Sequence, residues 1–137
     1  MMRHFNILCF TEFNDATLTR IFSTIVDWHL GAKHDGKQFD NDVQRLGSKC
    51  VSATLQAYRW AMRELLPTPQ KVHYTFNLRD FSRVVQGIML HVPCEGFDGG
   101  SFIRLWLHEM LRVFGDRLIE DADREKFHTF LMECMQK

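Results

Sequence analysis

The sequence predicts a mainly α-helical domain in which one short β-strand is followed by five helices. Hydrophobic residues recur at helical spacing in five stretches, and clusters of glycine, proline or polar residues separate these stretches. Only residues 5–10 (FNILCF) form a short apolar run of the kind that is typical of a buried strand. Of the 137 residues, 45% are hydrophobic and 25% are charged, as in a single globular domain.

The predicted strand has no partner in this chain. A strand cannot satisfy its own backbone hydrogen bonds, so residues 5–10 point to a sheet that lies outside the sequence. The first helix begins near Asn14 or Asp15, because either side chain can cap a helix, and it stops at Gly31. Its predicted buried face holds Leu18, Ile21, Phe22, Ile25 and either Trp28 or His29.

A long second helix follows a polar loop. The loop covers residues 31–42 and contains two glycines and three aspartates. The helical pattern returns at Val43 and must end by Leu66, because Pro67 and Pro69 follow directly.

Three shorter helices complete the prediction. After the connection over residues 67–78, a third helix starts at Asn77 and continues to Met89. A glycine-rich turn precedes a fourth helix, for which Ser101 is the predicted N-cap. The acidic residues 120–123 suit the positive end of a last helix.

Composition excludes several classes of protein. Lysine plus arginine and aspartate plus glutamate both number 17, which argues against a general nucleic-acid binder. No apolar run approaches the 18 or so residues that a membrane helix needs, so no membrane association is expected. The four cysteines are far apart and no secretory signal accompanies them, which indicates reduced thiols in the cytosol.

No complete catalytic or metal-binding set is visible. His108-Glu109 begins like a zinc-protease motif, but Arg112 occupies the place of the second histidine and predicts an ion pair with Glu109 instead. His91 and Cys94 lack the third group that would orient a nucleophilic pair. The sequence also lacks the glycine-rich loop with lysine that cradles phosphates.

The strongest candidate for a binding site is the start of the third helix. Arg79 and Arg83 lie four residues apart at a helix N-terminus, where the dipole favours anions and a guanidinium can hold a phosphate. The alternative is purely structural: Asn77 or Asp80 caps the helix and Arg83 pairs with Asp80. Physics alone favours the structural alternative, because ion pairs on helix faces are common.

Five sequence blocks, in the same order, resemble the dynein heavy chain family, and the axonemal type most of all. The resemblance spans residues 3–127 and concerns the third AAA+ module, after its nucleotide-binding core. The blocks are HFN at 4–6, IFSTIVDWHL at 21–30, LLPTP at 65–69, HYTFNLRDFSRVVQG at 73–87 and RLWLHEMLRVFGDRL at 104–118.

The resemblance implies a division of the chain and a role for one arginine. Residues 3–12 would supply the last strand of the module's large α/β subdomain, and residues 13–137 would form its helical lid. Arg79 matches the sensor-2 arginine, which contacts the phosphates of ATP or ADP in the intact module. This implication shifts the balance from the ion-pair interpretation to phosphate sensing for Arg79, whereas Arg83 is expected to serve packing or a local ion pair.

The resemblance also implies partners and a location. The lid would contact its own large subdomain and the neighbouring AAA+ modules, and would relay nucleotide state around the motor ring. Microtubules would be reached only through parts of the heavy chain that this sequence lacks. The expected location is the cytoplasmic cytoskeleton, in the axoneme of a cilium or flagellum.

The chain by itself is not expected to be an enzyme. The Walker A loop, the Walker B carboxylates and the sensor-1 residue of an AAA+ ATPase are missing, so nothing would position magnesium or activate water. An alternative of a different class is a free-standing helical module that binds a protein partner without catalysis. The twelve phenylalanines and three tryptophans could supply a second apolar surface for such a partner.

Overall fold

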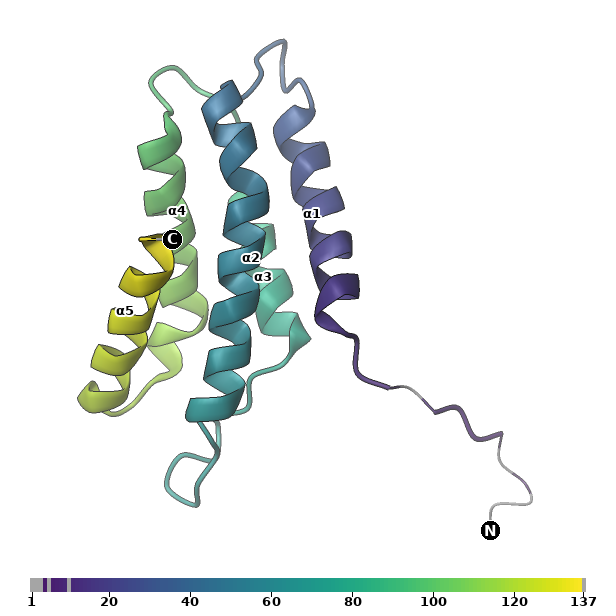
Figure 1. Ribbon diagram of the computed structural model, residues 1–137, viewed down its shortest axis with the longest axis vertical. Coiled ribbons are helices and arrows are strands. Elements are labelled where there is room, and N and C mark those ends of the chain that lie inside the picture. The colour runs from purple at the N-terminus through teal and green to yellow at the C-terminus, as the bar shows by residue number, and fades with distance from the viewer. Residues whose placement is uncertain (1–3, 5, 10, 137) are drawn as a thin grey trace.

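The computed structural model describes residues 4, 6–9 and 11–136 and arranges most of them in a helical bundle (Figure 1). The prediction of a mainly α fold with five helices is confirmed. In chain order the elements are α1 (Asp15–Gly31), α2 (Asn41–Glu64), α3 (Leu78–Met89), α4 (Gly99–Val113), the short 3-10 helix η2 (Gly115–Arg117) and α5 (Asp121–Met135).

Helix α2 is the centre of the bundle and packs against each of the other four α-helices. In the view of Figure 1, α1 lies on one side of α2, whereas α4 and α5 lie on the other and α3 is behind. Residues 6–9 and 11–14 lead away from the foot of α1 as an extended tail. This arrangement leaves one long side of α1 without a neighbouring helix.

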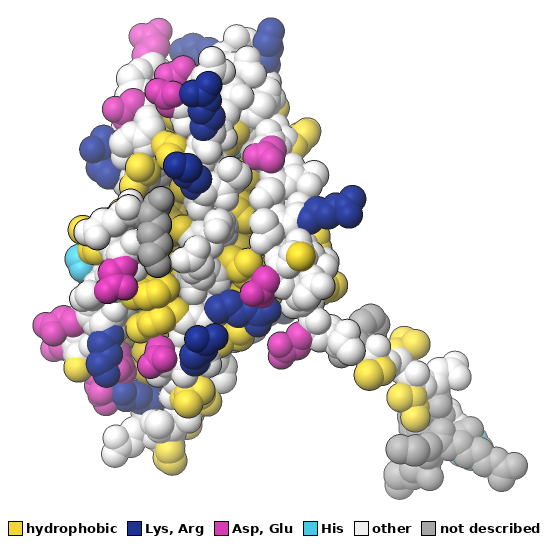
Figure 2. All heavy atoms as spheres, in the orientation of Figure 1, with side chains coloured by type: hydrophobic (Ala, Val, Ile, Leu, Met, Phe, Trp, Pro, Cys, Tyr) yellow, Lys and Arg dark blue, Asp and Glu magenta, His cyan; other side chains and the backbone are white. Residues whose placement is uncertain are grey.

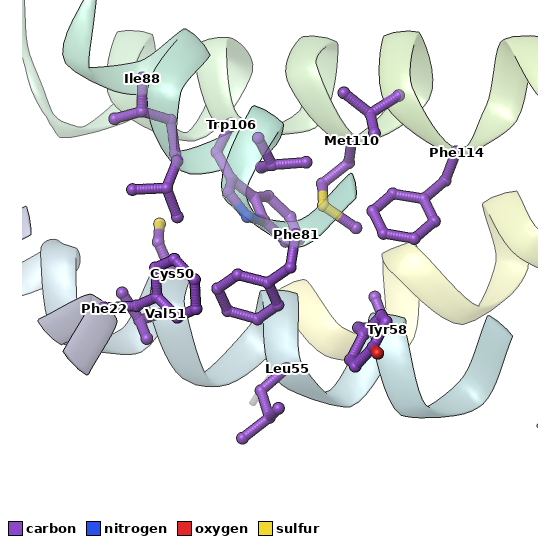
Figure 3. Close-up of a cluster of buried hydrophobic side chains, with 14 of the residues drawn as sticks. Phe22, Cys50, Val51, Leu55, Tyr58, Phe81, Ile88, Trp106, Met110 and Phe114 are labelled. Atoms are coloured by element: carbon purple, nitrogen blue, oxygen red, sulfur yellow. The ribbon is translucent and has the colours of Figure 1, made fainter. Parts of the chain in front are cut away.

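The hydrophobic core lies where α2, α3 and α4 meet. Phe81 of α3 is fully buried there, and its ring contacts Phe22 of α1 at a centroid distance of 4.2 Å and Tyr58 of α2 at 6.1 Å (Figure 3). Polar groups in this core are paired: the Trp106 indole N–H donates to the Thr54 hydroxyl at 2.9 Å, and that hydroxyl donates to the Cys50 carbonyl at 2.7 Å.

The sequence predicts N-caps for α1, α3 and α4, and those of α1 and α3 are confirmed. The Asn14 side chain accepts the Thr17 N–H at 2.8 Å, as predicted for the first helix. The predicted Ser101 cap is wrong, because α4 begins at Gly99 and Asp98 is its N-cap. The Asp98 carboxylate accepts the Ser101 backbone N–H at 2.8 Å, and a carboxylate at this position caps at least as well as a hydroxyl.

The buried face of α1 differs from the predicted one. Leu18 and Phe22 are buried as expected, and of the two alternatives His29 is buried while Trp28 is 67% exposed. Ile21 and Ile25, predicted to be in the core, are exposed.

The close approach of α1 to α2 explains why the buried face of α1 differs from the predicted one. It occurs at Gly47, where a Cβ atom would meet the side chains of Leu30 and Val26. Because a glycine offers no side chain to pack around, the α1 face that carries Val26 and Leu30 turns toward α2, and both residues are buried. Helix propensity alone counts Gly47 as a weak point of α2, whereas its packing role is to let α1 approach closely.

The predicted strand over residues 5–10 is not formed within the described part of the chain. Residues 6–9 have no strand assignment, while residues 5 and 10 lie outside the described residues. Ile7 is 68% exposed and Leu8 is 78% exposed. A strand forms by pairing with another strand, and among the described residues no strand is available to pair with it.

Candidate functional site

Arg79 lies in the first turn of α3 and its side chain is exposed to solvent. Among the described residues, its guanidinium has no hydrogen-bond or ion-pair partner. Arginines on helix faces commonly pair with a carboxylate, so an unpaired guanidinium at a helix N-terminus is available to an anion from outside the chain.

A capping box holds the turn that carries Arg79. The Asn77 side chain accepts the backbone N–H of Arg79 at 2.9 Å and of Asp80 at 3.3 Å. In return, the Asp80 carboxylate accepts the Asn77 N–H at 3.0 Å. The backbone amides of Asn77, Arg79 and Asp80 are therefore already satisfied, and an anion at this helix end would meet the Arg79 side chain.

Asp80 forms a bidentate ion pair with Arg117, which the sequence did not indicate as its partner. Arg117 of η2 donates to both carboxylate oxygens of Asp80, at 2.7 and 3.1 Å, and also to the Thr75 carbonyl at 3.0 Å. Its guanidinium lies 5.1 Å from the ring centre of Phe76. The predicted ion pair with Arg83 also forms, although the Arg83 Nη1 is 4.0 Å from the carboxylate and its side chain is half exposed. No local spacing signals this pair, because 37 residues separate its members.

Burial and hydrogen bonding act in opposite directions on Asp80. Burial alone would raise the pKa of this carboxyl, because the charged form loses water. The hydrogen bonds from Arg117 and from the Asn77 backbone outweigh burial, so the pKa of Asp80 lies below its ordinary value. Asp80 is therefore a firmly ionised partner for Arg117, which leaves Arg79 without a competing carboxylate.

The connection that leads into α3 is fixed by a second polar cluster. The Lys71 ammonium pairs with Asp123 of α5 at 2.6 Å and with Glu120 at 2.7 Å. The Tyr74 hydroxyl donates to Asp123 at 3.2 Å and accepts the Ile119 N–H at 3.0 Å. Together with Arg117, these contacts set the position from which Arg79 projects.

The hollow at the start of α3 is small. Its volume is about 140 Å³, below the several hundred Å³ typical of small-molecule pockets. It lies between the N-terminal tail, α1, α2 and α3, and Glu12, Phe13, Leu18, Tyr58, Arg59 and Leu78 line it. A nucleotide near Arg79 would therefore need most of its binding surface from elsewhere.

The other candidates from the sequence have structural explanations. Glu109 and Arg112 form the predicted ion pair, with the Arg112 Nε at 3.0 Å from the carboxylate. The Cys94 sulfur lies 3.9 Å from the His91 ring nitrogen, at an exposed site. Across residues 4, 6–9 and 11–136, no group of three or more potential ligands gathers to hold a metal ion. None of the described helices is both long and apolar enough to cross a membrane.

Comparison with known proteins identifies the family. The AAA+ lid domain family matches residues 50–137, from the middle of α2 to the C-terminus. Mouse and human dynein axonemal heavy chain 3 are each 50% identical over 131 residues, which is 96% of this chain and 3% of theirs. Human dynein axonemal heavy chain 1 is 41% identical over 143 residues, covering all of this chain and 3% of its own.

The match covers very different shares of this chain and of its relatives. Nearly the whole chain is similar to these relatives, yet it spans only about one thirtieth of their length. The region that matches the AAA+ lid domain family contains most of α2 and all of α3, α4 and α5. The chain therefore belongs to the AAA+ lid domain family and is a fragment of an axonemal dynein heavy chain.

Proposed function

We propose that this chain is the lid of the third AAA+ module of its heavy chain and that Arg79 is the sensor-2 arginine. The observation that carries the proposal is the state of Arg79: it is exposed at the N-terminus of α3 and has no partner among the described residues. The neighbouring carboxylate, Asp80, is held by Arg117 instead. The sequence blocks quoted above support the third module over the others.

ATP or ADP in the parent module would be the anion that Arg79 binds. An exposed guanidinium fits a phosphate, because its planar set of donors matches two phosphate oxygens. The rest of the nucleotide site lies outside this sequence, which contains no phosphate-binding loop. The isolated lid therefore contributes one positioned charge and no catalysis.

The bundle would transmit the nucleotide state as a rigid body. Residues buried between α2, α3 and α4 tie Arg79 to the whole bundle, and the Asp80–Arg117 pair ties α3 to η2. Movement at the phosphate would then turn the lid against its own large subdomain and the neighbouring modules, with hinges at the connections. In this role the chain serves ATP-driven, microtubule-based movement in the cilium, although microtubules are contacted elsewhere in the motor.

Residues 3–12 would complete the sheet of the large subdomain, with residues 13–137 forming the lid. Support comes from the exposed apolar side chains of Ile7 and Leu8, which have no cover in this chain. A sheet edge in the parent module would pair their backbone and bury both side chains.

The test is Arg79→Ala in the complete heavy-chain motor, with Arg83→Ala as the matched control. Both changes remove one guanidinium from the same helix. Loss of a charge-assisted contact to a phosphate should weaken nucleotide binding at the third module about tenfold or more. Site-resolved fluorescence of a labelled nucleotide measures this affinity. The control should change it less than about twofold, because Arg83 lies beside Asp80.

Equal affinities for Arg79→Ala and the parent motor would refute the sensor role. Circular dichroism of the variants tests whether a substitution lowers nucleotide affinity only by unfolding the lid. Arg79 makes no side-chain contact that holds the described bundle together, so its loss should leave helix content unchanged.

A further inference from the structure

Helix α1 carries a second apolar stripe that faces away from the bundle. Ile21, Ile25 and Trp28 follow one another at the i, i+4, i+7 spacing of a single helix face, and all three are exposed. Trp28 is 67% exposed, which is unusual for the largest apolar side chain. Figure 2 shows hydrophobic side chains along this outer edge of the molecule. We call these residues, with Thr24 between them, the outer α1 stripe.

Charged residues are absent from the outer α1 stripe. At about 100° per residue, Asp15, Arg20 and Asp27 fall at other positions around the helix. Thr24, within the stripe, turns its hydroxyl back to the Arg20 carbonyl at 2.7 Å and so offers solvent no free donor. A solvated helix face normally carries charged residues, so a neutral stripe beside an already buried face indicates a second packing partner.

We infer that the outer α1 stripe packs against the part of the heavy chain that precedes this sequence. The inference rests on the proposed function, in which residues 3–12 belong to a preceding subdomain. It goes further, because it assigns a particular helix face, distinct from the Arg79 end of α3, as the contact between lid and subdomain.

The course of the chain selects the preceding part as the occupant. Residues 6–9 and 11–14 leave the foot of α1 on the side of the bundle where α1 is the outermost helix (Figure 1). Leu8 and Phe13 in this tail are further exposed apolar side chains on the N-terminal side of α1. In contrast, the chain ends at α5, on the far side of α2 from α1. A body attached to the tail therefore lies nearer the stripe than a body attached to α5.

The relatives show that enough polypeptide exists to cover the stripe. The matched region is 3% of dynein axonemal heavy chain 3, so most of such a heavy chain lies outside it. A second copy of the lid or a later part of the heavy chain would bury the same side chains. The experiment separates these occupants.

Photo-crosslinking in the intact heavy chain tests the inference. Trp28→p-benzoylphenylalanine places a light-activated group in the stripe and keeps an aromatic side chain there. After irradiation, mass spectrometry identifies the peptide joined to residue 28. Most of the cross-linked product should contain peptides from the sequence that precedes this fragment. The matched control is Met132→p-benzoylphenylalanine on α5, which is also exposed and should not join to the preceding part.

Three results would overturn the inference. Residue 28 could cross-link to later parts of the same heavy chain, it could cross-link to a second heavy chain, or it could give no cross-linked peptide. The failure of this inference is separable from the failure of the sensor proposal. Replacement of Arg79 changes nucleotide affinity, whereas the cross-link at residue 28 reports contact alone. A motor with the Arg79 effect and a cross-link to a later segment would reject the stripe assignment and keep the sensor.

Discussion

At the scale of single residues, Arg117 determines how the start of α3 behaves. It binds both oxygens of Asp80, whose side chain is 4% exposed, and it also anchors the Thr75 carbonyl. Through these contacts one arginine neutralises a buried carboxylate and fixes the segment before the helix. Arg79 projects from the same turn but takes no part in this network.

Arg117→Met should therefore destabilise the chain much more than Arg79→Met. Removal of one partner leaves the Asp80 carboxylate buried without its counter-charge, at a cost of about 3 kcal/mol in the free energy of unfolding. An exposed and unpaired guanidinium contributes less than about 0.5 kcal/mol. Urea titration followed by circular dichroism measures both values. Similar losses for the two variants would contradict the division of roles between the two arginines.

His29 gives the chain a dependence on pH. Its ring is buried and donates to the His91 carbonyl at 3.0 Å, with the His34 ring at 4.8 Å. Burial lowers the pKa of His29 below 6.5, and the neighbouring histidines add to this effect, although the hydrogen bond to His91 opposes it. The folded chain thus binds protons less readily than the unfolded chain at this site. Its contribution to stability is complete above the unfolded pKa and is lost as the pH falls below about 6.5.

The expected result is a falling free energy of unfolding between about pH 7 and pH 5, with a slope of at most about 1.4 kcal/mol per pH unit from this group. His29→Gln keeps a donor for the His91 carbonyl but cannot titrate, so its profile should be flatter. His128→Gln is the control, since His128 is exposed on α5. An unchanged slope in His29→Gln would assign the pH dependence to other groups.

The sequence pattern indicated the start of α3 as a candidate binding site, but it did not indicate the contacts around that site. Asn77 and Asp80 signal a capped helix start because capping is local in sequence, and the structure confirms the capping box. Arg83 was the expected partner of Asp80 because spacing favours i,i+3 pairs. That pair forms at 4.0 Å, but Arg117 binds Asp80 more closely because η2 brings the two together. A contact between segments 37 residues apart leaves no trace in local spacing.

At the scale of helices, glycines mark where two elements come close. A Cβ atom at Gly87 of α3 would collide with the Glu109 side chain of α4, which is buried and bound to Arg112. The α3–α4 contact therefore depends on the absence of a side chain at position 87. Gly31, at the end of α1, has nothing within 4 Å of such a Cβ and provides the comparison.

Gly87→Ala should lower the free energy of unfolding by about 1–3 kcal/mol, because the overlap with Glu109 outweighs the better helix propensity of alanine. Gly31→Ala should change it by less than about 1 kcal/mol, and in the stabilising direction if at all. In a Glu109→Ala background the Gly87→Ala penalty should disappear, which a double-mutant cycle from urea titrations detects. Persistence of the full penalty in that background would show that another neighbour causes it.

The sequence predicted which segments form helices better than it predicted which face of α1 is buried. Five amphipathic stretches with breaks at glycine and proline are a local property, and all five helices form. The inward face of α1 was ambiguous because apolar residues surround much of that helix. Contact with Gly47 resolves it in favour of Val26 and Leu30 and turns Trp28 outward. This is tertiary packing information, which helical periodicity does not contain.

At the scale of the whole molecule, we propose that two distinct regions of the lid contact the rest of the motor. One is the Arg79 end of α3, which carries a free charge, and the other is the outer α1 stripe, which carries none. Residues 6–9 and 11–14 lead away from the bundle. A rigid bundle that joins a charged end to an apolar side could couple nucleotide contact to domain position in the ring.

If the lid supplies only the Arg79 guanidinium to the nucleotide site, the isolated chain should bind ATP only weakly. The amides of Arg79 and Asp80 are satisfied by Asn77, and the hollow beside them holds about 140 Å³. A single exposed guanidinium cannot replace the many backbone donors of a phosphate-binding loop. Isothermal titration of the isolated chain with Mg-ATP should therefore give a Kd weaker than about 1 mM, with no difference between the parent chain and Arg79→Ala above about threefold. Micromolar affinity that Arg79→Ala removes would mean that the lid alone forms a nucleotide site, and the large subdomain would then add catalysis to an existing site instead of supplying most of the binding surface.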